Sequence, residues 1–235
     1  MKLMTYNLLN GAKETLPQVL EVIRNESPDF LTINEANTFT ANDNKILKEV
    51  ATIGNFSHFG LSLSGEYDYH VAIFSKYPWI KIEEIRPMRN AGLIALFKSN
   101  LGLLSIAGVH LTPTSEDLRL PEIDLITGLQ KDHDLRIMMG DINSLSRHDG
   151  YDPEIIKDFN EMQLKKFTTA GEFRFDAVEK ILSSGYFDIA LELGKNHDYT
   201  APTSINEYSA HSNMRLDYIF ASKPLLSHLK DYSVI

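Results

Sequence analysis

Short apolar runs that end at polar side chains restrict the possible folds of this 235-residue chain more than any other feature. The run at residues 137–139 leads into Gly140-Asp141-Ile142-Asn143, which places a carboxamide two residues after a carboxylate. Residues i and i+2 of an extended chain point to the same side, so we expect Asp141 and Asn143 to face one substrate together. Taken alone, the segment is also ordinary turn composition, and a capped loop is an equally good interpretation.

Other apolar runs have the same form. The runs at residues 3–7, 30–35 and 103–110 end at Asn7, Glu35 and His110, and the run at residues 214–220 carries Asp217 in its middle. Rigid strands whose ends converge are how α/β proteins build functional sites. Each polar residue taken singly is more simply a residue of a turn, whereas the set favours a site at one edge of a sheet.

Helical patterns alternate with these strands. Apolar spacing predicts helices near residues 15–26, 46–50, 118–129, 155–159 and 178–182. Glycine and proline residues break residues 56–110 into successive strands. With no linker or repeat in the sequence, we predict one domain over residues 1–235, of the α/β (α+β) class with mixed strands.

The polar strand ends also resemble the signature blocks of a known superfamily. The blocks are Thr5-Tyr6-Asn7, Ile33-Asn34-Glu35, Gly108-Val109-His110-Leu111, Gly140-Asp141-Ile142-Asn143 and Arg215-Leu216-Asp217-Tyr218. In this order they are similar to those of the endonuclease/exonuclease/phosphatase superfamily, which includes abasic-site endonucleases, pancreatic-type deoxyribonucleases, neutral sphingomyelinases and inositol polyphosphate 5-phosphatases. The resemblance implies a four-layer sandwich, in which two mixed β-sheets pack face to face with helices on both outer sides and the site lies at one end.

The resemblance implies a metal site built from few protein ligands. Glu35 is then the main carboxylate ligand of Mg²⁺, with Mn²⁺ as a possible substitute, because Mg²⁺ prefers hard oxygen ligands and keeps several waters. Asn7 helps to hold the metal or the substrate phosphate.

The resemblance also assigns the chemical steps. Asp141 orients the attacking water or assists the leaving group, and Asn143 donates a hydrogen bond to the phosphate. His110 donates to the transition state, where negative charge develops. Asp217 fixes the tautomer of a further histidine, which takes the proton of the water.

That further histidine belongs to a Ser-Asp-His block that closes the superfamily pattern. No such block follows Asp217 within residues 218–235, and neither His211 nor His228 lies in that context. We expect the histidine in a C-terminal extension. The alternative is a homologue that has lost this base.

The remaining histidines and the tryptophan carry less functional information. His70 follows an aromatic segment, and its sequence fits a substrate-binding residue at the mouth of the site as well as a polar strand edge. His133, His148, His197 and His228 lie among polar residues and are expected at the surface, whereas Trp79 is expected in the core.

Charge narrows the list of partners. Lys and Arg number 23 against 32 Asp and Glu, which gives a net charge of −9 and argues against a protein that grips duplex DNA through many phosphates. The basic residues that could form a local rim are scattered and are expected to be solvated: Lys76, Arg86, Arg89, Arg147, Lys165, Lys166 and Arg174. The absence of cysteine and of a targeting or membrane-spanning pattern makes the cytoplasm the expected location.

These observations predict an Mg²⁺-dependent phosphoesterase that cleaves a phosphodiester or phosphomonoester by direct attack of water. The expected partner is a phosphorylated small molecule, a lipid headgroup or a nucleic acid. One alternative is a DNA endonuclease or exonuclease, which needs an electropositive groove beside His110. The other is a noncatalytic homologue that binds a phosphorylated ligand or a protein.

Overall fold

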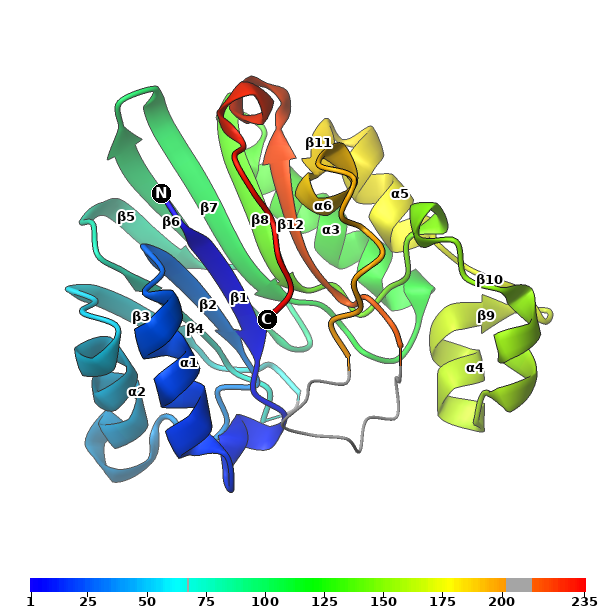
Figure 1. Cartoon of the computed structure of the whole chain (residues 1–235), viewed down its shortest axis with the longest axis horizontal. Helices are drawn as coiled ribbons and strands as arrows, with labels where there is room; N and C mark the ends of the chain where they lie inside the picture. The colour runs from blue at the N-terminus through cyan, green and yellow to red at the C-terminus, as the bar shows by residue number, and fades with distance from the viewer. Residues whose placement is uncertain (67, 202–212) are drawn as a thin grey trace.

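A computed structural model describes residues 1–66, 68–201 and 213–235 and contains two large mixed β-sheets (Figure 1). The four-stranded sheet has the order β1-β2-β4-β3, with β1 at Leu3–Asn7, β2 at Phe30–Asn34, β4 at Val71–Ser75 and β3 at His58–Ser62. The six-stranded sheet has the order β11-β12-β8-β7-β6-β5, with β11 at Tyr186–Asp188, β12 at Asp217–Ser222, β8 at Leu135–Asp141, β7 at Gly102–His110, β6 at Ala91–Ser99 and β5 at Trp79–Glu84.

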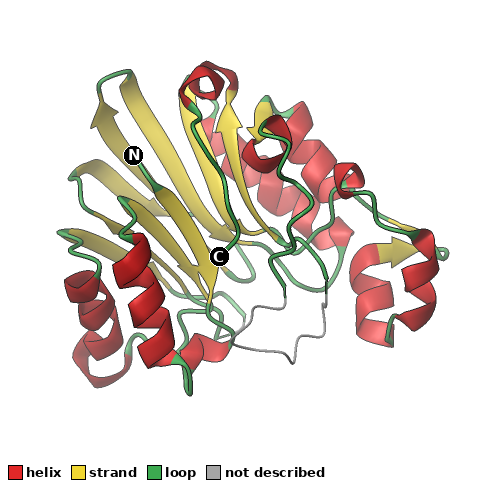
Figure 2. Cartoon of the chain, in the orientation of Figure 1, coloured by secondary structure: helices red, strands yellow, loops and turns green. Residues whose placement is uncertain are grey.

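Helices cover the outer face of each sheet (Figure 2). The four-stranded sheet carries α1 (Leu16–Glu26) and α2 (Ala41–Ile53), and the six-stranded sheet carries α3 (Glu116–Gln130) and α5 (Asp176–Ser183). The short α6 (Ile189–Glu192) follows β11, and its Ile189 belongs to the cluster between the sheets. A small outlying unit consists of α4 (Glu161–Phe167) and the two-residue strands β9 (Thr168–Thr169) and β10 (Glu172–Phe173).

Three hydrophobic clusters fill the three interfaces between these layers. In β2, Leu31 and Ile33 pack against α1 and α2, whereas Phe30 faces the other sheet. In β8, Met138 packs against α3 and α5, whereas Ile137 and Met139 face the other sheet. Both faces of these central strands are therefore buried, which explains why they are continuous apolar runs and not alternating ones. The structure confirms the predicted four-layer sandwich.

Two predictions about secondary structure were wrong. Residues 155–159 form no α-helix, because the chain makes a short 3-10 helix at Pro153–Asp158 and Phe159 is already extended. The α-helix α4 was not predicted, although Asn160 and Gln163 form a capping box at its start, which is a recognisable sequence signal. In addition, Asp217 begins β12 and does not lie in the middle of the strand.

Strand register brings the polar strand ends to one end of the sandwich. Parallel pairing aligns Asn7 with Asn34 in one sheet and His110 with Asp141 in the other. The antiparallel β12 starts at the same level, because Asp217 pairs with Asp141. Backbone pairing thus aligns the strand ends within each sheet, and side-chain packing between the sheets brings the two sets together.

Gly140, directly before Asp141, has a backbone that only glycine adopts without strain. Its φ is +142°, and an added Cβ would lie 1.8 Å from the carbonyl oxygen of Val109 on the neighbouring strand. We expect Gly140→Ala to lower the free energy of unfolding by about 2 kcal/mol or more, measured by urea denaturation. As a control, Gly128→Ala in α3 meets no atom within 4 Å and should be neutral or stabilising. Equal stability of the two variants would contradict this account of Gly140.

Candidate active site

Asn7, Glu35 and Asp141 form the centre of the candidate site. The Nδ2 of Asn7 lies 3.2 Å from Glu35 Oε1 and 2.9 Å from Asp141 Oδ2, so one carboxamide bridges two carboxylates. The second oxygen of Glu35 accepts the backbone N–H of Asn10 at 2.7 Å. Three predicted site residues, at the ends of β1 and β8 and directly after β2, are therefore in contact across the two sheets.

The backbone at two of the predicted site residues is strained. Glu35 has φ 56° and Asn143 has φ 57°, in the left-handed region that disfavours residues with a Cβ. Each such residue costs on the order of 1 kcal/mol and is commonly retained at functional sites. At Asn143 the turn is held by its N–H, which donates to Asp141 Oδ1 at 2.8 Å.

The expectation that Asp141 and Asn143 continue one extended strand was wrong. Strand β8 ends at Asp141, and the left-handed residue at 143 turns the chain immediately afterwards. The two side chains are nevertheless both buried within the same small region, with exposures of 5% and 3%. A turn, and not strand alternation, brings them together.

Asn34 is a positioning residue whose role the sequence analysis missed, although it lies within a signature block. Its Nδ2 donates to the Val109 carbonyl at 2.8 Å, and its Oδ1 accepts the Asp141 N–H at 3.1 Å. One fully buried carboxamide therefore joins β2 to both β7 and β8. It fixes the position of Asp141 relative to Glu35, the residue that follows Asn34.

His110 lies at the end of β7 beside Asp141. Its Nε2 is 3.6 Å from Asp141 Oδ2, and its ring packs against that of Tyr69 with centroids 5.8 Å apart. The side chain is 2% exposed, and Nδ1 has no hydrogen-bond partner within the described parts of the chain. His110 is thus placed beside the carboxylate centre as predicted.

Asp217 lies at the start of β12, next to Asp141 in the sheet. Burial raises the pKa of Asp217 above its usual range, and the nearby charge of Asp141 raises it further. Its Oδ1 has no hydrogen-bond partner among residues 1–66, 68–201 and 213–235. A buried carboxylate of this kind is poised to pair with a cationic or hydrogen-bonding group.

Lys166, at the end of α4, is a component that the sequence analysis placed wrongly at the surface. Its side chain is buried, with 3% of the residue exposed, and its Nζ donates to Asn143 Oδ1. The prediction failed because the end of α4 contacts Arg119 and Asn143, which lie far from it in the sequence. The neighbouring Lys165 is exposed, as expected.

His70 is placed in a local network next to the site. Its Nδ1 accepts the N–H of Ser64 at 3.0 Å, its Nε2 lies 3.0 Å from Asp68, and its carbonyl accepts the N–H of Ala36 directly after Glu35. These bonds orient the loops around Glu35. His211 and residues 202–203 of a secondary motif lie outside the described residues.

The oxygen atoms at this end of the sandwich fit a divalent ion that has few protein ligands. No group of three or more His, Asp or Glu side chains within the described ranges has the geometry of a complete metal site. Mg²⁺, however, needs only one or two carboxylates and keeps several waters. Glu35 and Asn7 offer oxygens that retain a free lone pair, and Asp141 lies beside them. A bound cation would favour the ionised form of Asp217, whose pKa burial raises.

In the part of the chain that the structure describes, no helix has both the length and the apolar character that crossing a bilayer requires.

Comparison with protein-family models identifies one family. The model of the endonuclease/exonuclease/phosphatase family matches residues 4–231. No curated protein sequence matches the chain. Among solved structures, a 3′ phosphatase NExo from Neisseria bound to product DNA hairpin is similar with a TM-score of 0.68 and 17% identity, over 98% of this chain and 90% of that one.

Two further structures have the same fold. An AP endonuclease from Archaeoglobus fulgidus matches with a TM-score of 0.67 and 17% identity, over 97% of this chain and 88% of that one. An endonuclease/exonuclease/phosphatase family protein from Leptotrichia buccalis matches with a TM-score of 0.63 and 18% identity, over 95% and 88% of the two chains.

Proposed function

The chain belongs to the endonuclease/exonuclease/phosphatase family, and we propose that it is an Mg²⁺-dependent hydrolase of a phosphodiester or phosphomonoester. The observation that carries this proposal is the bridge from Asn7 to both Glu35 and Asp141 at the junction of the two sheets. The Asn7 amide holds these two acids in the same small region, and such a region favours a bound cation. A site for a cation beside a hydrogen-bonding acid suits phosphate chemistry.

Glu35 and Asn7 are the residues that would hold the ion. When bound, Mg²⁺ supplies neutralisation of a phosphate oxygen and of the charge that develops on the leaving oxygen. Manganese is expected to substitute for it. The Asn10 N–H and the Asn7 amide fix both oxygens of Glu35, so the carboxylate is oriented before any ligand arrives.

The other residues act on the water and on the phosphate. Asp141 keeps free lone pairs with which it orients the attacking water, because each of its oxygens accepts only one hydrogen bond from Asn7 or Asn143. His110 and the free N–H of the Asn143 amide donate to phosphate oxygens, where negative charge grows in the transition state. We expect an imidazole at Asp217 Oδ1 to take the proton of the water.

The proposal is tested by hydrolysis with the full-length protein. The substrates are bis(p-nitrophenyl) phosphate, p-nitrophenyl phosphate, plasmid DNA and a phospholipid, each with Mg²⁺, Mn²⁺ or EDTA. We expect at least one substrate to be cleaved with Mg²⁺ and none in EDTA. If no substrate is cleaved with either metal, the hydrolase proposal is wrong and the noncatalytic alternative gains support.

The net charge of −9 favours a small or lipid-like phosphoester as the substrate over duplex DNA. The nuclease alternative draws support from the neighbours of similar fold, since one is a 3′ phosphatase bound to a DNA hairpin and another an AP endonuclease. The two alternatives are separated by measuring how strongly plasmid DNA inhibits hydrolysis of the p-nitrophenyl substrate, at low and at physiological salt. Strong competition at physiological salt would favour the nuclease.

A further inference from the structure

Lys166 is a buried ammonium group that contacts Asn143 and the ring of Phe167. Burial lowers the pKa of Lys166 to about 8, even though the nearby carboxylates of Asp141, Glu35 and Asp217 act in the opposite direction. Removing a charged amine from water destabilises the folded protein unless other interactions compensate. A lysine kept at such a position, 3% exposed and among the acids of the candidate site, points to a role in the chemistry of that site.

The backbone around Lys166 is held from two sides. The Nη2 of Arg119, a fully buried residue of α3, donates to the Lys166 carbonyl at 2.7 Å and to Glu116 at 2.9 Å. The next residue, Phe167, is fully buried in a cluster with Leu145. Because both anchors reach into the main body, the position of the ammonium group does not depend on the exposed part of α4.

The contact between Lys166 and Asn143 determines how the Asn143 amide is oriented. A lysine can only donate and a backbone carbonyl can only accept, so Oδ1 must face Lys166 Nζ and Nδ2 must face the Leu111 carbonyl, 2.9 Å away. One hydrogen of Nδ2 is thereby used within the protein, and the second is left for another acceptor. Without the lysine, the Leu111 carbonyl alone would hold this orientation, and the amide oxygen would lose its donor.

We propose that Lys166 is a positioning residue of the phosphoester site, which fixes the Asn143 amide so that its free N–H points to the substrate phosphate. This inference rests on the proposed hydrolase function. It assigns the outlying unit of α4, β9 and β10 a part in the reaction, because that unit carries the ammonium group to the strand ends.

Lys166→Met tests the proposal, because methionine retains most of the side-chain length and removes the charge. We expect kcat for the cleaved phosphoester to fall about tenfold to a hundredfold with KM changed little, since the lost contact serves the transition state. Lys165→Met, at the exposed neighbouring position, is the matched control and should match the wild type. Thermal unfolding of both variants shows whether any loss of turnover reflects a loss of stability.

A double-mutant cycle with Asn143→Ala separates positioning from other roles. If Lys166 acts through Asn143, the double variant is no slower than Asn143→Ala alone. The proposal would be overturned if the two substitutions lowered kcat by independent factors that multiply in the double variant. It would also be overturned if Lys166→Met kept the wild-type kcat, or if its lower activity were explained by lower stability. An inactive wild type would instead reject the hydrolase function, and with it this role, whereas an active Lys166→Met rejects only the role of Lys166.

Discussion

Replacing Glu35 with Gln is expected to lower turnover of the cleaved phosphoester by about 10²-fold or more, because a carboxylate that serves the transition state is removed. The neutral amide keeps nearly the same shape but loses the negative charge that binds a divalent ion. It also replaces one acceptor oxygen, although the Asn10 N–H and the Asn7 amide each need an acceptor at this side chain. The measurement is kcat/KM over a range of Mg²⁺ concentrations, with an increased metal requirement expected in the variant. Asp141→Asn should lower turnover by a similar factor without that increase.

The matched control is Glu49→Gln on the exposed face of α2, which removes the same charge from a residue outside the candidate site. It should leave both turnover and metal requirement unchanged. Melting temperatures of all variants show whether a loss of turnover reflects unfolding. If a folded Glu35→Gln variant kept the wild-type turnover, Glu35 would not be the metal ligand that we propose.

Arg215→Met is expected to give a large loss of stability, about 3–5 kcal/mol, because it leaves two buried carboxylates without their cation. The Arg215 guanidinium binds Asp149 at 2.7 Å and 3.1 Å and Asp188 at 2.6 Å and 3.1 Å, and all three side chains are at most 2% exposed. Its plane also lies over the ring of Tyr218, 4.3 Å from the centroid. For a chain of this size, we expect the melting temperature to fall by roughly 6–20 °C.

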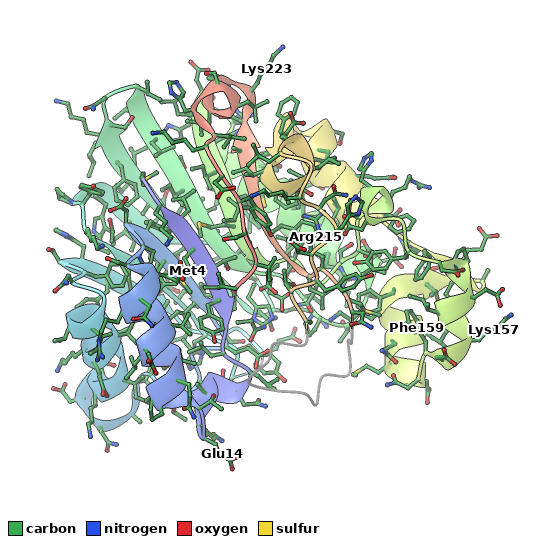
Figure 3. All side chains as sticks on the ribbon, in the orientation of Figure 1. Met4, Glu14, Lys157, Phe159, Arg215 and Lys223 are labelled. Carbon is green, nitrogen blue, oxygen red and sulfur yellow. The ribbon has the colours of Figure 1, made fainter. Side chains whose placement is uncertain are left out.

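Lys157→Met provides the comparison for Arg215, because Lys157 forms an ion pair with Glu154 that is more than 70% exposed. Figure 3 shows Arg215 within the body of the molecule and Lys157 at its right-hand edge. Exposed pairs contribute about 0–1 kcal/mol, so Lys157→Met should hardly change the melting temperature. Calorimetry of the two variants makes the comparison, and a loss below about 1 kcal/mol in Arg215→Met would contradict the structural role of this network.

The sequence predicted most of the fold because its strongest signals are local. The helices α1, α2, α3 and α5 follow the apolar spacing, and the strands β1, β2, β7 and β8 are apolar runs long enough to be recognised. Residues 153–167 were assigned less well. Their short apolar pattern fits one helix. In the structure, a 3-10 helix starts at Pro153, and a separate helix, α4, starts at the capping box of Asn160 and Gln163.

Side-chain chemistry in the signature blocks likewise identified Asn7, Glu35, His110, Asp141, Asn143 and Asp217 as candidates, and the structure brings these residues to one end of the sandwich. Their catalytic roles stay predictions. Asn34 was overlooked because nothing in its local sequence distinguishes a carboxamide that joins two sheets from one that ends a strand.

The sequence by itself thus determined which segments are buried strands and which polar residues end them, because both depend on neighbours along the chain. Only the tertiary structure decided that one Asn7 amide bridges two carboxylates, that a turn at Asn143 replaces the expected extension, and that Lys166 is buried beside it. Lys165 and Lys166 are chemically identical neighbours, yet one is solvated and the other lies among the acids. The difference arises because α4 packs through Phe167 and the Arg119 contact, which join residues far apart in the chain.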